Sequence, residues 1–157
     1  MKILAMSDTH GDFFTMQDII QNNFDCKMFL HAGDGCRDFE DISFSHPTKQ
    51  FIWVRGNCDY DLLSTDMRIL IEQGKKILLV HGHVQGAKHS IEGLKRLAAE
   101  NQADIVVYGH SHKSKIDIEN GVLFVNPGSP VRPRGCEPSF AIIEINGDKI
   151  DCKIVTL

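Results

Sequence analysis

Five short polar clusters follow short apolar runs in this chain of 157 residues, and they restrict its fold more than any other feature of the sequence. The clusters are Asp8-Thr9-His10, Gly33-Asp34, Gly56-Asn57-Cys58-Asp59, His81-Gly82-His83 and Gly109-His110-Ser111-His112. Short apolar runs bounded by turn residues are typical of buried strands. Open α/β sheets bind ligands beyond the carboxyl ends of their strands, so we expect all five clusters to converge at one place.

Buried strands are predicted over the uninterrupted apolar runs, which are residues 3–6, 28–30, 51–54, 77–80 and 105–108. Residues 67–71 carry an apolar side chain at every second position, which indicates a half-buried strand. Two helices are predicted, one after Asp12 and one after Ser90, and both of these residues are suitable N-caps. Their apolar residues recur at helical spacing: Phe13, Met16, Ile20 and Phe24, then Ile91, Leu94, Leu97 and Ala98. The first third therefore has a βαββ pattern.

The last third of the chain predicts antiparallel hairpins. Asn120-Gly121 and Asn146-Gly147 each lie between strand-like segments, and Asn-Gly is the strongest short-range hairpin signal. No linker, repeat or change of composition divides the chain. We therefore predict one domain over residues 1–157, of mixed α/β (α+β) class, in which two packed β-sheets are flanked by helices.

Charge and hydropathy argue against several classes of protein. The chain has 17 Lys and Arg against 21 Asp and Glu, and the net charge of −4 disfavours binding to nucleic-acid phosphates. No apolar run approaches the roughly 18 residues of a transmembrane helix, and the N-terminal apolar run is too short for a signal peptide. The five cysteines form no C-x-x-C pair, which favours a reducing compartment. We expect a soluble cytoplasmic protein.

The clusters also supply residues that bind metal ions. Asp8 and His10 are two residues apart, as are His110 and His112, so each pair would point to one side of an extended segment. A single pair of this kind is more often a loop histidine bonded to the backbone, but here the pairs occur together after buried strands. The candidate ligands are Asp8, His10, Asp34, Asn57, His81, His110 and His112.

Seven candidates exceed the ligands of one zinc ion and suit two ions that share a carboxylate. Two-metal sites promote in-line displacement at phosphorus. Mixed imidazole and carboxylate ligands suit Mn, Fe, Zn or Ni better than Ca or Mg. Two divalent ions leave the site positive beside Asp8 and Asp34, so we expect an anionic phosphate ester as substrate.

In their order along the chain, these motifs resemble those of the calcineurin-like metallophosphoesterase superfamily. Residues 54–59 and Asn126-Pro127-Gly128-Ser129 are similar to its small single-domain branch, the YfcE-type phosphodiesterases. The resemblance covers residues 4–134 and implies a four-layer αββα sandwich with a dinuclear centre, for which Mn is the expected metal. It implies one ion held by Asp8, His10, Asp34 and His112, and another held by Asp34, Asn57, His81 and His110.

The resemblance further implies attack on phosphorus by a hydroxide that the two metals activate, with Asn57, Cys58 and His83 as candidate catalytic residues. Many members have a histidine after the metal-binding asparagine, where it contacts phosphate or protonates the leaving group. Here that residue is Cys58, a poor acid for this role, so we hypothesise a preference for diesters with good leaving groups. The alternative for Cys58 is a small buried filler, and for His83 a structural hydrogen bond.

Several other residues carry expectations of their own. Asp59 is expected to orient a neighbouring ligand or to cap a helix. Arg132 and Arg134 are candidate phosphate contacts. Phe13, Phe14 and Phe29 are expected in the core rather than as a platform for stacking bases.

Two further classes of function remain open. A phosphomonoesterase or nucleotide pyrophosphatase could use the same centre, and the superfamily includes a retromer subunit that serves as a protein-binding scaffold with a degraded site. All seven ligand types are present here, which weighs against a scaffold. A nuclease is disfavoured because no basic stripe with interleaved aromatic residues is visible. The branch also implies a homodimer or homotetramer.

Overall fold

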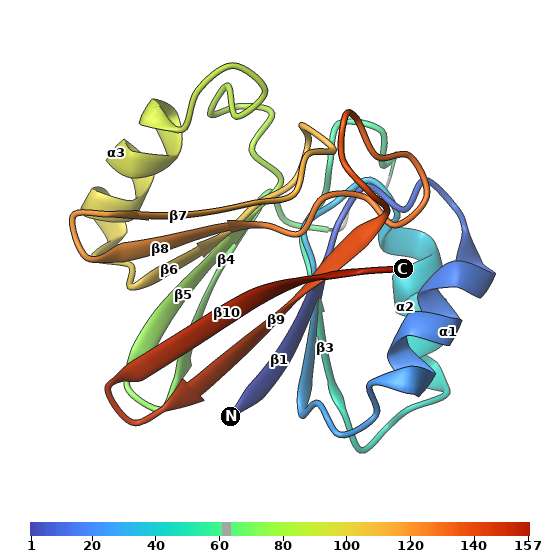
Figure 1. Cartoon of the computed structure of the whole chain (residues 1–157). Coiled ribbons are helices and arrows are strands. Elements are labelled where there is room, and N and C mark those ends of the chain that lie inside the picture. Colours follow the sequence, from blue (N-terminus) through green and yellow to red (C-terminus); the bar gives the residue numbers. More distant parts are fainter. Residues whose placement is uncertain (61–63) are drawn as a thin grey trace.

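Two five-stranded sheets face each other in the computed structural model, which describes residues 1–60 and 64–157 (Figure 1). The first sheet has the strand order β10 (Lys149–Thr156), β9 (Ser139–Asn146), β1 (Lys2–Met6), β2 (Met28–His31) and β3 (Gln50–Trp53). The second has the order β4 (Met67–Glu72), β5 (Lys75–Val80), β6 (Ile105–Val107), β8 (Val122–Asn126) and β7 (Lys115–Glu119). The described residues also form the helices α1 (Phe13–Asn22), α2 (Cys36–Phe44) and α3 (Glu92–Asn101).

The central strands are buried on both faces, which explains their uninterrupted apolar sequences. Alternate side chains point to opposite faces of a strand. Ile3 and Ala5 therefore pack between the two sheets, whereas Leu4 and Met6 pack beneath α1 and α2. A further apolar cluster lies beneath α3 on the outer face of the second sheet. The predicted four-layer αββα sandwich is confirmed.

Parallel pairing decides where the polar clusters lie. Strands β1, β2 and β3 are parallel neighbours, and so are β5, β6 and β8. Parallel strands end at the same edge of a sheet. The segments that follow these strands meet in the upper middle of Figure 1, where the two sheets come together. All five polar clusters belong to these segments.

The structure differs from the predicted βαββ pattern by the additional helix α2. Its buried residues Cys36, Phe39 and Ile42 recur every third position, and Phe39 and Ile42 pack against the first sheet. The helix has only nine residues, and polar side chains separate the three buried ones. The helical spacing of these three residues was therefore too short a signal to predict α2 from the sequence.

The predicted hairpins and the first cap are confirmed. Strands β7 and β8 pair antiparallel around Asn120-Gly121, and β9 and β10 pair antiparallel around the second Asn-Gly. The Asp12 side chain accepts the Thr15 N–H at 2.9 Å at the start of α1. The N-cap of helix α3 is Ile91, one residue later than the predicted cap Ser90. No helix in the described part of the chain is long and apolar enough to cross a membrane.

One predicted core residue lies on the surface instead. Phe29 is fully buried, but the side chain of Phe14 is 77% exposed, so its assignment to the core was wrong. The inner face of α1 is formed by Phe13, Met16 and Ile20. Each helical residue turns by about 100°, so the residue after Phe13 points away from the sheet.

We predict that Gly93→Ala destabilises the protein, although alanine normally stabilises a helix interior by about 1 kcal/mol relative to glycine. Gly93 lies where α3 packs against the segment that follows His81. A Cβ atom at position 93 would lie 2.2 Å from the carbonyl oxygen of Gln85. Urea denaturation should show a lower free energy of unfolding than for the exposed control Ala99→Gly, and an increase over the wild type would contradict this packing.

Candidate metal centre

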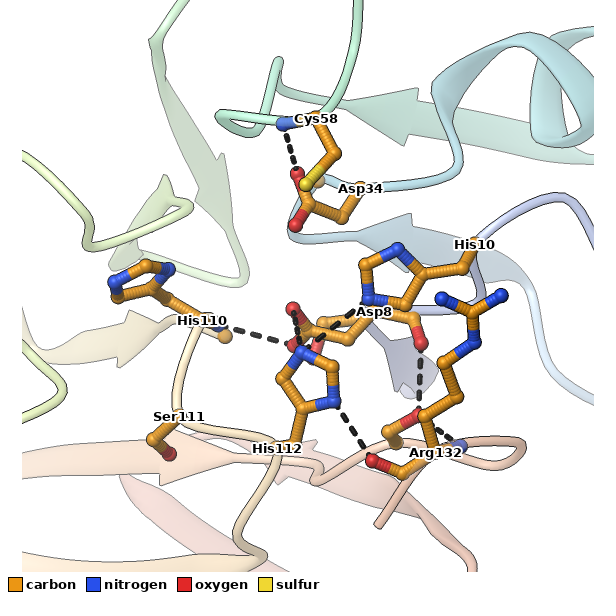
Figure 2. A network of polar contacts seen from close by, with 12 residues as sticks. Asp8, His10, Asp34, Cys58, His110, Ser111, His112 and Arg132 are labelled. Carbon is orange, nitrogen blue, oxygen red and sulfur yellow. Dashed lines mark hydrogen bonds and ion pairs between the residues drawn. The ribbon is translucent and has the colours of Figure 1, made fainter. Parts of the chain in front are cut away.

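Side chains from both sheets meet at the shared edge (Figure 2). The side chains of Asp8, His10, Asp34 and His112 point toward one another there. They follow β1, β2 and β6, and His81 joins them from the end of β5. The structure therefore brings together residues that lie as much as 104 positions apart in the sequence, from 8 to 112.

The predicted ligands have unusual backbone conformations. Five of them have φ angles between 45° and 69°, in the left-handed region: Asp8, His10, Asp34, His110 and His112. They make up five of the eight non-glycine residues with positive φ in the described ranges. Each such residue costs of the order of 1–3 kcal/mol, and such strain gathers at functional sites. The expectation of extended ligand pairs was wrong, because left-handed residues rather than a period of two direct these side chains.

The first group of candidate ligands consists of Asp8, His10 and His112, whose ligand atoms all lie within 4.8 Å of one another. His112 Nδ1 donates to the carbonyl oxygen of Arg132 at 2.7 Å, which leaves a lone pair on Nε2. This Nε2 atom lies 3.3 Å from His10 Nε2 and 3.4 Å from Asp8 Oδ1. Asp8 Oδ1 is buried and has no hydrogen-bond partner among the described residues. A buried carboxylate oxygen of this kind needs a positive partner.

The second group consists of Asp8, Asp34 and His81, again within 4.8 Å. His81 Nδ1 donates to the carbonyl oxygen of Ala32 at 2.7 Å, so the lone pair of a neutral ring lies on Nε2. That atom is 3.5 Å from Asp34 Oδ2 and 3.1 Å from Asn57 Oδ1. Three atoms that carry lone pairs therefore face one another, as ligands do around a cation.

Burial sets the protonation of these groups. It lowers the pKa of His10 and His112, and it lowers the pKa of His81 to about 4 against the opposing charge of Asp34. The imidazoles are therefore neutral near pH 7 and available to a metal ion. Burial also raises the pKa of Asp8 to about 7, and the charge of Asp34 adds to this effect. A bound dication would remove the cost of this buried carboxylate.

Cys58 lies at the mouth of the centre and is exposed, so its alternative interpretation as a buried filler is wrong. Its thiol lies within 4.8 Å of ligand atoms of His10 and Asp34. Its backbone N–H donates to Asp34 Oδ1 at 2.8 Å, as Figure 2 shows. Burial, followed by the hydrogen bond to Asp34, raises the pKa of the thiol to about 11. The thiol is therefore neutral at pH 7 and able to donate a hydrogen bond.

His110 and His83 lie beside the centre rather than within the groups of three. The backbone N–H of His110 donates to Asp8 Oδ2 at 3.0 Å, while its ring packs edge-on against that of His81 at 5.1 Å between centroids. The ring of His83 lies 5.3 Å from that of His81. His83 Nδ1 is buried and has no hydrogen-bond partner among the described residues. The structural hydrogen bond that was the alternative role of His83 is therefore not found at this atom.

Asp59 fixes the segment that carries Asp34. Its carboxylate accepts the backbone N–H groups of Asp34 at 2.7 Å, Gly35 at 2.9 Å and Gly56 at 2.8 Å. It also accepts the N–H of Cys36 at 3.1 Å in the first turn of α2. Burial opposes its ionisation, but these donors and the Cys36 thiol hold the pKa below its usual value. Asp59 thus both orients a candidate ligand and caps a helix, as the two sequence interpretations proposed.

The sequence analysis missed how Asn126 and Ser129 support the centre. Ser129 Oγ donates to the carbonyl oxygen of Asp8 at 2.7 Å. Asn126 Nδ2 donates to the carbonyl oxygen of Gly109 at 2.9 Å and to Ser111 Oγ at 3.0 Å. Both residues are fully buried. The signal was the run Asn-Pro-Gly-Ser, which begins at the last residue of β8, but its contacts to two distant clusters appear only in the folded chain.

The two predicted arginine contacts differ in position. Figure 2 places the guanidinium of Arg132 beside the ring of His10. Arg132 lines the central pocket of about 240 Å³ together with His10, Asp34 and Cys58. Arg134 donates its backbone N–H to the carbonyl oxygen of His112 at 3.0 Å and thereby supports the segment of a candidate ligand.

Carboxylate and imidazole groups converge beyond the strand ends of this αββα sandwich, which is the arrangement expected of a metallophosphoesterase. The calcineurin-like phosphoesterase superfamily domain matches residues 1–148, and the chain belongs to this family. The structure and the donor chemistry fit the family's metal site, because the buried Asp8 oxygen without a partner faces neutral imidazole nitrogens.

The relatives agree with this assignment. The probable metallophosphoesterase YsnB of Bacillus subtilis (strain 168) is 32% identical over 151 residues, which cover 94% of this chain and 86% of YsnB. The phosphodiesterase YfcE of Escherichia coli (strain K12) is 32% identical over 97 residues, which cover 56% of this chain and 48% of YfcE. The crystal structure of a predicted phosphoesterase from Streptococcus pneumoniae TIGR4 superposes with a TM-score of 0.85 at 27% identity. The superposition covers 99% of this chain and 88% of the other. The small YfcE/YsnB-type branch is therefore confirmed.

We predict that Asp8→Asn stabilises the metal-free protein at pH 8 but not at pH 4. The folded pKa of Asp8 is about 7 against an unfolded value near 3.8. Ionised Asp8 therefore opposes folding increasingly as pH rises from 4 to 7, and the opposition is constant above that range. In urea denaturation with a chelator, the variant should gain about 2–4 kcal/mol over the wild type between pH 4 and 8.

The same comparison with excess Mn²⁺ provides the control. The wild type should then become the more stable protein, because metal binding favours the ionised carboxylate. A difference in free energy of unfolding that does not change with pH in the chelator would contradict the burial of the Asp8 carboxylate and of its unpartnered Oδ1.

Proposed function

We propose that residues 1–157 form one metallophosphoesterase domain that hydrolyses phosphodiesters with two divalent cations, manganese being our first choice of metal. One ion would be held by Asp8, His10, Asp34 and His112, and the other by Asp34, Asn57, His81 and His110. The proposal rests above all on the buried Asp8 Oδ1, which faces His112 Nε2 at 3.4 Å and has no hydrogen-bond partner in the described ranges. Asp34 supports a bridging role, because it forms a third group with His10 and Cys58 and also belongs to the group with Asp8 and His81.

The residues of the chain would prepare the centre for phosphoryl transfer. When bound, the two cations supply Lewis acidity toward the phosphoryl oxygens and lower the pKa of water, so that hydroxide serves as the nucleophile. The carbonyl oxygens of Ala32 and Arg132 hold His81 and His112 in the tautomers that present Nε2. Cys58 lies where its neutral thiol can donate to an ester oxygen, and we propose that His83 contacts the substrate.

The shape around the centre supports a diester rather than a monoester. The central pocket shares Arg37 and Cys58 with a second pocket of about 480 Å³. It shares His10 and Arg132 with a third pocket of about 440 Å³. The second and third pockets have no lining residue in common. A phosphodiester carries an organic group on each of two ester oxygens and can place one in each pocket, whereas a monoester needs only one.

The alternatives differ in what the centre would act on. A phosphomonoesterase or a nucleotide pyrophosphatase would use the same ligands. A non-catalytic scaffold is disfavoured because all seven candidate ligands are retained. A homodimer or homotetramer and a cytoplasmic location belong to the same proposal.

Metal analysis by mass spectrometry and an assay with added Mn²⁺ would test this function. We expect about two transition-metal ions per chain and faster hydrolysis of an aryl diester than of the corresponding monoester or a dinucleoside polyphosphate. Asp34→Asn should bind less metal and lose at least about 100-fold in kcat, because it weakens the shared ligand. The control Asp38→Asn changes a carboxylate that lines the same pocket but belongs to none of the three groups.

Other results would decide against the proposal in different ways. Wild-type turnover by Asp34→Asn would refute the shared carboxylate. Faster hydrolysis of the monoester would indicate a phosphomonoesterase, and faster hydrolysis of the dinucleoside polyphosphate would indicate a nucleotide pyrophosphatase. A protein that binds metal but hydrolyses none of the three esters would support the scaffold.

We predict that Cys58→His makes the rate less dependent on the leaving group. A neutral thiol with a pKa of about 11 is a weak acid, whereas an imidazolium protonates a departing alkoxide readily. In a series of diesters with leaving groups of increasing pKa, the wild-type rate should fall steeply. Cys58→His should gain about tenfold or more on the poorest leaving groups and little on the best. Cys58→Ala is the control, and a flat wild-type series would count against this role of the residue.

A further inference from the structure

Phe14 is an exposed aromatic residue beside the candidate metal centre. It is the second residue of α1, and 77% of its side chain is exposed. The neighbouring Phe13 packs against the core and contacts the Phe14 ring edge-on, at 5.8 Å between centroids and an interplanar angle of 86°. Phe14 is thus held at its base and presents free ring surface outward.

A groove of about 440 Å³ joins Phe14 to the centre. Phe13 and Phe14 line it from the start of α1, and Val131 and Arg132 line it from the segment between β8 and β9. His10 lines both this groove and the central pocket, as does Arg132. Because the groove and the central pocket share these lining residues, a ligand bound at the metal centre can extend from one into the other.

The lining suits a flat aromatic ring. Phe14 and Val131 offer apolar surface, and the guanidinium of Arg132 forms no ion pair or side-chain hydrogen bond in the described part of the chain. Guanidinium groups and aromatic rings both stack on planar rings. The Asp12 carboxylate, which also lines the groove, accepts the N–H of Thr15 at Oδ1. An aliphatic chain would gain much less from these two flat partners.

We propose that this groove binds a planar aromatic ester group of the substrate, and that Phe14 is a specificity-determining residue. This inference rests on the proposed function, since the groove opens from the phosphoryl site. It narrows the substrate class to phosphodiesters with a ring, aryl or nucleobase, on one ester oxygen. Phe14 acts on binding and takes no part in the chemical step.

The chain offers a matched control. Phe44 lies at the end of α2 and is 75% exposed, nearly the same fraction as Phe14. It does not line the groove or the central pocket. Phe14→Ala therefore removes an exposed phenyl ring near the centre, and Phe44→Ala removes a nearly equally exposed ring away from it. Both rings lie on the surface, so neither change removes a core side chain.

Calorimetric binding to the Mn²⁺-loaded protein would test the proposal without turnover. The probes are methylphosphonate, phenylphosphonate and a nucleoside 5′-phosphonate, which contain no ester bond to cleave. We expect the wild type to bind at least one ring-bearing probe about tenfold more tightly than methylphosphonate. Phe14→Ala should abolish this preference, Phe14→Trp should retain it, and Phe44→Ala should leave it unchanged. The ring-bearing probe that binds more tightly identifies the natural ring as aryl or nucleobase.

Several outcomes would overturn the inference. They are equal affinity of the wild type for all three probes, a preference that survives Phe14→Ala, and an equal loss with Phe44→Ala. Light scattering that shows a change of oligomeric state with Phe14→Ala, but no change in ring preference, would mean that the residue serves contact between chains. If the protein hydrolyses phosphodiesters but shows no ring preference, only the inference about the groove is wrong. If it shows a ring preference but hydrolyses none of the esters, the groove is supported and the proposed function is wrong.

Discussion

The hydrogen bond from the backbone of His110 to the carboxylate of Asp8, 3.0 Å long, joins the two sheets at the edge where the candidate metal centre lies. Asp8 follows β1 of the first sheet, and His110 follows β6 of the second. This contact uses one carboxylate oxygen and leaves the other buried toward His112. The same side chain therefore links the two sheets and carries the unbalanced charge that a cation would satisfy.

Residues around the candidate ligands offset the free-energy cost of this arrangement. Left-handed backbone at five candidate ligands and a buried carboxylate both oppose folding. Asp59, Asn126 and Ser129 offset this cost because they satisfy backbone groups in the segments that carry the ligands. The protein's own hydrogen bonds thus orient the segments that carry the candidate ligands, which is how a metal site gains a defined geometry.

Access to the centre is shaped by residues that are not candidate ligands. Arg37 and Arg132 belong to different pockets that open from the central one. Cys58 stands at the mouth with a neutral thiol, where a stronger acid would assist poor leaving groups. Family membership defines phosphoester chemistry, and these surrounding side chains are the features that would select among phosphoesters.

The sequence by itself determined the main strands, both hairpins, the αββα sandwich and the family, because apolar runs, Asn-Gly turns and ordered motifs are local signals. It did not reveal α2, whose three buried residues lie in a polar segment. Only the tertiary structure decided the exposure of Phe14 and Cys58, the left-handed ligand backbone, and the contacts of Ser129 with Asp8. Those features depend on which distant segments pack together, and no pattern of neighbouring residues records that.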